Sequence, residues 1–293
     1  MKKLTIIIPV KNKQLELKNT NNINTKLVDV IIEEGNNPSK NRNKGVKKAK
    51  TEFVAFINAH TILNDFWIDE VIYFFKKYPD FDIVGGPQLT PKKDSYFGKV
   101  SGFALSSKFG SANLVKRYAS GEVNLNANEN MLTSANLICK KKVFEKIKFD
   151  EDLYPGEDPK FIEDAKKNGF KVAYSPKIKV YNSRRNSLNR LIKQMYMYGK
   201  TRPKKESFLK TLKNPFFLIP SIFVIYLLLL PFLIFISYLF LLPFLTYIIL
   251  NMLFSLIISV KNFDIPSCVL LFIIYPTIHL SYGTGFIVGL LKK

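Results

Sequence analysis

The sequence predicts an α/β domain followed by a membrane region of about three helices, and two observations carry that prediction. From Phe216 to Val260, 45 residues pass without an Asp, Glu, Lys, Arg or His, more than twice the roughly 20 apolar residues that cross a bilayer once. Before that run, short apolar stretches alternate with stretches of helical spacing. Such alternation is typical of a doubly wound, mostly parallel sheet with helices on both faces.

The first apolar runs are expected to be buried parallel strands. They cover residues 4–10, 27–32 and 53–57, and they are continuous because both faces of a parallel sheet are covered. A helix is expected from about 39 to 50, with Ser39 as its N-cap. Ligands of such sheets bind beyond the carboxyl ends of the strands. The candidate site residues are therefore those that end each run, at 9–11, 33–36 and 58–60.

The rest of the domain follows the same alternation. Helical spacing at 64–78 and 159–168 and apolar runs at 82–86, 132–139 and 171–174 predict further elements, whereas the polar stretch 92–130 is expected to be an irregular loop that serves a site. Residues 188–198 have amphipathic spacing and basic neighbours, as a helix in the membrane interface would. The predicted organisation is an α/β domain at 1–185, an interfacial basic segment at 186–214 and a membrane region at 215–293.

Within the membrane region, a turn near 237–243 separates two passes, and the stretch 265–291 is long enough for a third. Gly285 and Gly289 have a spacing that lets another helix approach closely. Between residues 193 and 213, seven Lys or Arg stand against one acid, Glu206, and such cations stay in the cytoplasm. The α/β domain is therefore expected in the cytosol. Three passes would put the C-terminus outside the cytosol, although the two lysines at the end of the chain favour the cytosolic side.

The formal net charge of +21 favours polyanionic partners, namely anionic lipid headgroups, a nucleotide diphosphate or nucleic acid. Nucleic acid is the least favoured, because the basic cluster abuts a membrane span and no nucleic-acid-binding motif is present. The apolar stretch at the N-terminus runs into lysines without a cleavage site, so a strand is expected there and not a secretion signal. Cys139 and Cys268 have no disulfide or metal-ligand spacing and are expected to stay reduced.

Six short elements occur in an order that resembles family 2 glycosyltransferases. They are Ile-Ile-Pro-Val at 7–10, the acids at 33–34, Ser-Lys-Asn-Arg-Asn-Lys-Gly at 39–45, Phe-Val-Ala-Phe-Ile-Asn-Ala-His at 53–60, Gly-Gly-Pro at 85–87 and Gly-Glu-Asp at 156–158. Downstream, Gln194 with Tyr-Gly-Lys at 198–200, and the stretch 279–286, are similar to the membrane-bound branch related to succinoglycan-type glucosyltransferases. This resemblance implies a GT-A fold, a nucleotide-diphosphate sugar donor and an inverting displacement at the anomeric carbon.

The resemblance also implies roles for particular residues. Asp158, the last residue of the Glu-Asp motif, is expected to be the base that takes the proton of the acceptor hydroxyl, with Glu157 as a supporting carboxylate. The alternative is that both acids only cap the helix that follows. Donor binding is expected of Pro9, Val10, Glu33, Glu34, Arg42, Asn58 and Gln194, with one of the two glutamates reading the uracil or ribose. For Arg42, the alternative is a solvated helix face.

Three features depart from the family pattern. Where the family has Asp-x-Asp this chain has Asn58-Ala59-His60, so His60 is the candidate ligand for Mg²⁺ or Mn²⁺, and Asn58 can hydrogen-bond a ribose without charge. The alternative for His60 is a strand-end histidine bonded to the backbone. Met197 stands where the family has Arg, and Lys200 or Arg202 are the candidate substitutes. The sheet is also expected to lack one strand, between the two acids and the helix at 39–50.

The predicted function is that of a glycosyltransferase in the cytoplasmic membrane. It would move a sugar from a UDP-sugar to a lipid-linked or growing saccharide, with its catalytic domain in the cytosol and membrane lipids as partners. An anchored enzyme meets a membrane-confined acceptor at high effective concentration. Two alternatives remain open: a polyprenyl-phosphate sugar synthase, and a degenerate member that binds saccharide or acts as a scaffold without catalysis.

Overall fold

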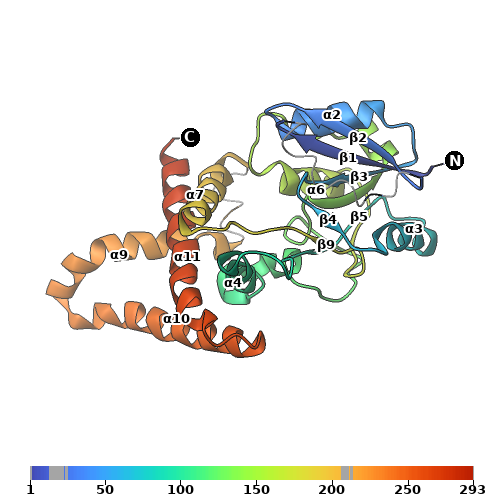
Figure 1. Cartoon of the computed structure of the whole chain (residues 1–293). Helices are drawn as coiled ribbons and strands as arrows, with labels where there is room; N and C mark the ends of the chain where they lie inside the picture. The colour runs from blue at the N-terminus through green and yellow to red at the C-terminus, as the bar shows by residue number, and fades with distance from the viewer. Residues whose placement is uncertain (1, 13–22, 24–25, 206–210, 212–213, 293) are drawn as a thin grey trace. The chain divides into compact units, whose positions relative to one another are not determined.

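The computed structural model describes residues 2–12, 23, 26–205, 211 and 214–292 (Figure 1). The chain divides into two compact units. The α/β unit comprises Met1–Pro91 and Leu114–Ser183, and the helical unit comprises Lys92–Asn113 and Arg184–Lys293. The chain thus passes between the units after residues 91, 113 and 183, the last of which lies near the predicted boundary at 185. Residues 92–113 group with the C-terminal helices.

The α/β unit is built on a six-stranded sheet with the order β2-β1-β3-β7-β5-β8. Its strands are β1 (Leu4–Val10), β2 (Asp29–Glu34), β3 (Phe53–Ile57), β5 (Ile83–Gly85), β7 (Asn136–Lys140) and β8 (Val172–Tyr174). Strand β7 pairs antiparallel with β3 and β5, and the other pairings are parallel. The sheet is thus mostly parallel, as predicted. A second sheet has the order β4-β9-β6, from β4 (Ile62–Leu63), β9 (Val180–Tyr181) and β6 (Gln88–Leu89).

Helices cover both faces of the main sheet. Because successive side chains of a strand point to opposite faces, Ile6 and Ile8 pack in one core with Trp67 of α3 (Trp67–Lys77), whereas Ile7 packs in another. That second core contains Val46 of α2 (Pro38–Lys48) and Phe161 of α6 (Glu157–Lys167). This double winding confirms the predicted class of fold.

Two local predictions at the start of α2 need correction. Asn37, and not Ser39, is the N-cap: its side chain accepts the Lys40 backbone N–H at 3.0 Å, and Pro38 occupies the first helical position, where its missing N–H costs nothing. Strand β2 covers 29–34 and not 27–32, so the two acids are part of the strand. Only residues 35–37 separate β2 from α2, so no strand lies between them. Strand β2 is therefore at the edge of the sheet, which agrees with the predicted loss of a strand.

The prediction of an irregular loop at 92–130 is wrong for its first part. That part forms α4 (Tyr96–Leu105) and α5 (Lys108–Ser111), and a short 3-10 helix, η2 (Ala112–Arg117), follows. The glycines and serines that resemble a loop in the sequence are instead the close-packed face of α4, where Gly98, Ser101 and Gly102 are buried beside Val100 and Ala104.

The helical unit also contains four long helices: α7 (Leu188–Lys205), α9 (Ile219–Ile236), α10 (Leu242–Lys261) and α11 (Ser267–Leu291). The last three are long and apolar enough to cross a membrane. A 3-10 helix at Tyr238–Leu241 separates α9 from α10, where the turn was predicted. Helix α7 extends further than the predicted 188–198. Of the basic segment before α9, Glu206, Lys210 and Lys213 lie outside the described residues.

Helices α7 and α11 touch through their backbones. A Cβ atom on Gly285 would lie 2.1 Å from the carbonyl oxygen of Tyr196, and one on Gly289 would lie 2.3 Å from that of Lys200. From the other side, a Cβ on Gly199 would lie 2.1 Å from the carbonyl oxygen of Tyr282. No side chain larger than hydrogen fits at these distances, so the predicted close approach at Gly285 and Gly289 is confirmed, with α7 as the partner helix.

Candidate functional site

The candidate catalytic acids open helix α6. Helix α2 begins just beyond the carboxyl end of β2, and α6 runs back toward the start of β8, so the first turns of both helices lie at the carboxyl edge of the parallel strands. Gly156 precedes α6 with a φ of +127°, a conformation that a glycine adopts without strain. Glu157 and Asp158 occupy the first turn, where the helix dipole favours negative charge.

Arg42 of α2 joins these two acids in a buried cluster. Its Nη1 lies 3.0 Å from Glu157 Oε1 and 3.8 Å from Asp158 Oδ1. The side chains of Arg42 and Glu157 are each only 5% exposed, and that of Asp158 is 20% exposed. The guanidinium also lies over the ring of Phe149, 5.3 Å from its centroid. Arg42 is therefore not on a solvated helix face, and the structure pairs it with the candidate catalytic acids.

The two acids have different environments. Burial, together with the charge of Asp158, raises the pKa of Glu157 from its ordinary 4.5 to about 7, although Arg42 acts in the opposite direction. Glu157 Oε2 also accepts the Gly156 backbone N–H at 3.0 Å, so both of its oxygens are engaged. Asp158 Oδ1 is buried and has no hydrogen bond among the residues that the structure describes. Asp158 is thus the acid that is both more exposed and incompletely bonded.

Glu33 and Glu34 point to opposite faces of the sheet. They pair in register with Pro9 and Val10 at the ends of β2 and β1. Glu33 is buried, and its Oε1 lies 2.7 Å from Lys48 Nζ on α2, whereas Glu34 is exposed. The sequence left open which glutamate faces a ligand. The structure leaves Glu34 accessible and engages Glu33 with α2.

The backbone ends of β1 and β2 are fixed by one side chain of α2. Asn41 Nδ2 donates to the carbonyl oxygens of Val10, at 3.3 Å, and Gly35, at 2.9 Å, and the Gly35 N–H donates to the Val10 carbonyl at 2.9 Å. The side chain of Val10 is buried, and the ring of Pro9 is partly buried. A ligand could therefore contact the backbone of these residues and the exposed part of the Pro9 ring. Asn41 was not singled out from the sequence, although it stands beside Arg42 in the matched Ser-Lys-Asn-Arg motif.

The turn after β3 presents Asn58 and His60, and both are exposed. The Asn58 N–H donates to Thr61 Oγ1 at 3.1 Å, and the Thr61 N–H returns to the Asn58 carbonyl at 3.0 Å. Thr61 Oγ1 in turn donates to Asn182 Oδ1 at 2.7 Å, and Asn182 Nδ2 donates to Gln88 Oε1 at 2.8 Å. Sequence reasoning missed this buried polar chain, which comes from three separate segments and holds the turn in place.

These residues do not build a metal site by themselves. Within the described ranges, no three His, Cys, Asp or Glu side chains come together in a group that could hold an ion. Asn58 and His60 supply at most two ligands, so a divalent ion would need oxygens of a bound diphosphate to complete its coordination. No catalytic step of this protein is therefore assigned to a metal ion.

Gln194 lies on α7 in the helical unit and not in the α/β unit. Its Oε1 accepts from Arg185 Nε at 3.3 Å, and its Nε2 donates to the Tyr198 hydroxyl at 3.0 Å. Arg202, a substitute for the missing family arginine, lies 3.7 Å over the ring centroid of Phe217. The amide of Gln194 is thus bonded within its own helix and the segment before it.

An open, mostly parallel sheet with a buried Arg and two acids at its carboxyl edge defines an α/β enzyme domain. The chain belongs to the family described as "Glycosyltransferase like family 2", whose model matches residues 18–197. The mixed α/β fold that was predicted is thus the fold of a member of this family, and three helices among the described residues are long and apolar enough to span a membrane. A comparison with curated proteins finds no match.

Several solved structures are similar to this chain. S. aureus TarS is 16% identical with a TM-score of 0.42, over 68% of this chain and 40% of TarS. TarS 1-349 in complex with UDP is 17% identical with a TM-score of 0.43, over 66% of this chain and 63% of that chain. A197 from STIV is 16% identical with a TM-score of 0.41, over 61% of this chain and 84% of A197. The chain thus spans less than half the length of the first TarS structure.

Proposed function

We propose that the protein is a membrane-bound, inverting glycosyltransferase that moves a sugar from a UDP-sugar to a lipid-linked or growing saccharide acceptor. The observation that carries this proposal is the cluster of Arg42, Glu157 and Asp158 at the carboxyl edge of the sheet in a family 2 glycosyltransferase. The choice of UDP and the relation to the succinoglycan-type branch rest on the sequence resemblance.

Asp158 acts as the base in this proposal. The acceptor hydroxyl oxygen attacks the anomeric carbon, its proton passes to a carboxylate oxygen of Asp158, and the bond from that carbon to the diphosphate breaks, with the electron pair leaving on UDP. Of the two acids, Asp158 is the one that an acceptor can reach, because its side chain is 20% exposed and that of Glu157 is 5% exposed. Because Oδ1 is buried on the side of Arg42, the proton would pass to Oδ2 of Asp158.

Glu157 and Arg42 then act as positioning residues. The guanidinium contacts both acids, so it fixes the distance of Asp158 from the core of the domain. The raised pKa of Glu157 limits the negative charge of the cluster near neutral pH. Acids that only cap a helix need no buried arginine beside them, so the contact of Arg42 with both acids supports a role beyond capping.

Donor binding is assigned to the ends of β1, β2 and β3. Glu34 and Asn58 are exposed there and can hydrogen-bond a ribose or base, and the backbone around Pro9 and Val10 forms the floor. His60 would hold Mg²⁺ or Mn²⁺ together with the diphosphate, which would neutralise the charge of the leaving group. Gln194, on α7, stays a candidate for donor binding on the sequence resemblance alone.

A membrane-confined acceptor explains why such a domain is joined to apolar helices. Anchoring the enzyme in the bilayer that holds the acceptor raises the effective concentration of the acceptor at the active site.

A polyprenyl-phosphate sugar synthase would gain from anchoring in the same way, with the lipid phosphate itself as nucleophile. The exposed Asn58 in place of an acid, and the lack of a three-ligand metal group in the described chain, instead favour a non-catalytic member.

Asp158→Asn tests the proposal in the full-length protein in membranes. Turnover of UDP-sugars should fall about 10²- to 10⁴-fold, the usual contribution of a general base, while calorimetric UDP binding stays near that of the wild type. Asp164→Asn is the matched control, because Asp164 lies on the same helix but pairs with Lys160 at 2.6 Å. It should keep wild-type turnover.

Each outcome separates the candidates. Wild-type turnover in Asp158→Asn would reduce Asp158 to a helix cap. A product with sugar joined directly to lipid phosphate would favour the synthase. Binding of UDP without turnover of any UDP-sugar or acceptor by the wild type would favour the non-catalytic member.

A further inference from the structure

We propose that α11 does not cross the membrane. It lies in the membrane interface, packed between α7 and the α4–α5 segment. Only the hairpin formed by α9 and the first turns of α10 then enters the bilayer, and it returns to the side from which it entered, so the C-terminus lies on that side. This proposal concerns the helical unit alone and does not depend on the proposed activity.

The charge of α7 keeps it out of the bilayer core. Its 18 residues include Arg190, Lys193, Lys200, Arg202, Lys204 and Lys205 and no acid. A lysine or arginine at the centre of a bilayer costs about 2.5 to 3.5 kcal/mol on insertion scales, whereas the same cations are favourable beside anionic headgroups. Helix α7 also precedes the first apolar helix, so it lies at the surface from which the chain enters the membrane.

The C-terminal half of α11 is held at that surface. Gly285 and Gly289 are in backbone contact with Tyr196 and Lys200 of α7, as described above. A Cβ on Gly283 would lie 2.3 Å from the carbonyl oxygen of Pro220, the second residue of α9. The last turns of α11 thus lie level with the point where α9 begins, and not a bilayer thickness away from it.

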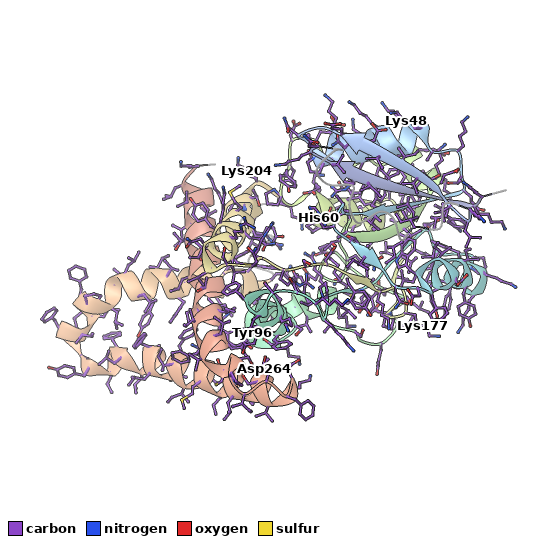
Figure 2. All side chains as sticks on the ribbon, viewed as in Figure 1. Lys48, His60, Tyr96, Lys177, Lys204 and Asp264 are labelled. Carbon is purple, nitrogen blue, oxygen red and sulfur yellow. The ribbon has the colours of Figure 1, made fainter. Side chains whose placement is uncertain are left out.

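The N-terminal end of α11 is held at the same surface by α4. Asp264, three residues before α11, accepts a hydrogen bond from the Tyr96 hydroxyl of α4 at 3.1 Å (Figure 2). Helix α4 belongs to the segment Lys92–Asn113, which leaves the α/β unit and returns to it without any run long enough to cross a bilayer. Both ends of α11 are therefore bonded to segments that stay on one side.

The middle of α11 is also at this level. His279 contacts the Tyr247 hydroxyl of α10 at 3.0 Å and the carbonyl oxygen of Phe109 in α5 at 2.8 Å. The ring of Tyr247 packs 4.4 Å from that of Phe223, only four residues after α9 begins. The α5 segment, the start of α9 and the middle of α11 therefore meet at one depth.

Burial separates α11 from the other two apolar helices. In α11, 39% of the apolar stretch is buried against other parts of the protein, compared with 6% in α9 and 11% in residues 238–261. The α9–α10 hairpin presents bare apolar side chains, as a lipid-embedded hairpin does. Helix α11 presents protein-covered faces to α7 and to α4–α5, and its length and apolar character are explained by that packing together with one face toward lipid.

The test locates the two termini of the full-length chain in a bacterial host. A green fluorescent protein, which fluoresces only when it folds in the cytosol, and alkaline phosphatase, which is active only after export, are each appended after Lys293. A fluorescent protein fused before Met1 reports the side of the N-terminus. Immunoblots of each fusion normalise the signals, and alkaline phosphatase that carries its own secretion signal serves as the exported reference.

We expect fluorescence at both ends and phosphatase activity below about a tenth of that of an exported reference at matched expression. This result requires an even number of crossings, which a hairpin that enters and leaves the bilayer on the same side satisfies. A C-terminal phosphatase that is active, with a C-terminal fluorescent protein that is dark and an N-terminal one that is bright, would show an odd number of crossings and overturn the proposal in favour of a spanning α11.

Discussion

Replacing Glu157 by glutamine should change how the stability of the protein depends on pH. Glutamine has nearly the same shape but does not titrate, and Glu157 is 5% exposed with its Oε1 3.0 Å from Arg42 Nη1. In the folded protein, the pKa of Glu157 is raised from 4.5 to about 7. Between these pH values the folded state keeps a proton that the unfolded state has lost, so the stability of the wild type falls as pH rises through this window.

The size of the effect follows from the two pKa values. One pKa unit corresponds to about 1.4 kcal/mol, and integration of the titration between pH 5 and pH 8 gives a loss of about 2–3 kcal/mol for the wild type, which the glutamine variant lacks. For a domain of 150–250 residues, 1 kcal/mol shifts the unfolding temperature by about 2–4 °C. The wild type should therefore lose about 5–10 °C relative to Glu157→Gln over this range.

Thermal unfolding in detergent at pH 5, 6, 7 and 8 measures this difference. All other titrating groups are common to both proteins, so they cancel when the two unfolding temperatures are subtracted at each pH. Parallel curves, with a constant difference from pH 5 to pH 8, would refute the raised pKa and with it the account of Glu157 as the buried, charge-limiting acid of the cluster.

Two further predictions concern other parts of the molecule. His60→Ala should weaken Mn²⁺-dependent UDP binding by about tenfold or more in calorimetry, since even outer-shell partners of metal ligands contribute about 10- to 100-fold. UDP binding of unchanged strength in the variant, or wild-type binding that does not depend on Mn²⁺, would remove His60 from the site. Gly285→Ala should lower the free energy of unfolding by about 1–3 kcal/mol, because its Cβ would lie 2.1 Å from the Tyr196 carbonyl oxygen. Gly121→Ala is the control for thermal unfolding, since its Cβ would meet only a side-chain carbon at 4.0 Å, and equal unfolding temperatures for the two variants would contradict the α7–α11 contact.

Local patterns in the sequence predicted the elements whose formation is local. The strands Leu4–Val10 and Phe53–Ile57 have the predicted bounds, because short continuous apolar runs are typical of strands that are buried on both faces. The break between α9 and α10 also falls where it was predicted. The prediction of a loop failed at α4 because glycine and serine disfavour helices in isolation, yet Gly98, Ser101 and Gly102 are buried within this one.

The site was predicted less well than the fold, for a physical reason. Its residues were found by resemblance, but their environments depend on pairings between distant parts of the chain. Arg42 and Glu157 are separated by 115 positions, and no periodicity in the sequence reports that they meet. Burial and the charge of Asp158 raise the pKa of Glu157, and the residues around 156–158 do not by themselves reveal that burial.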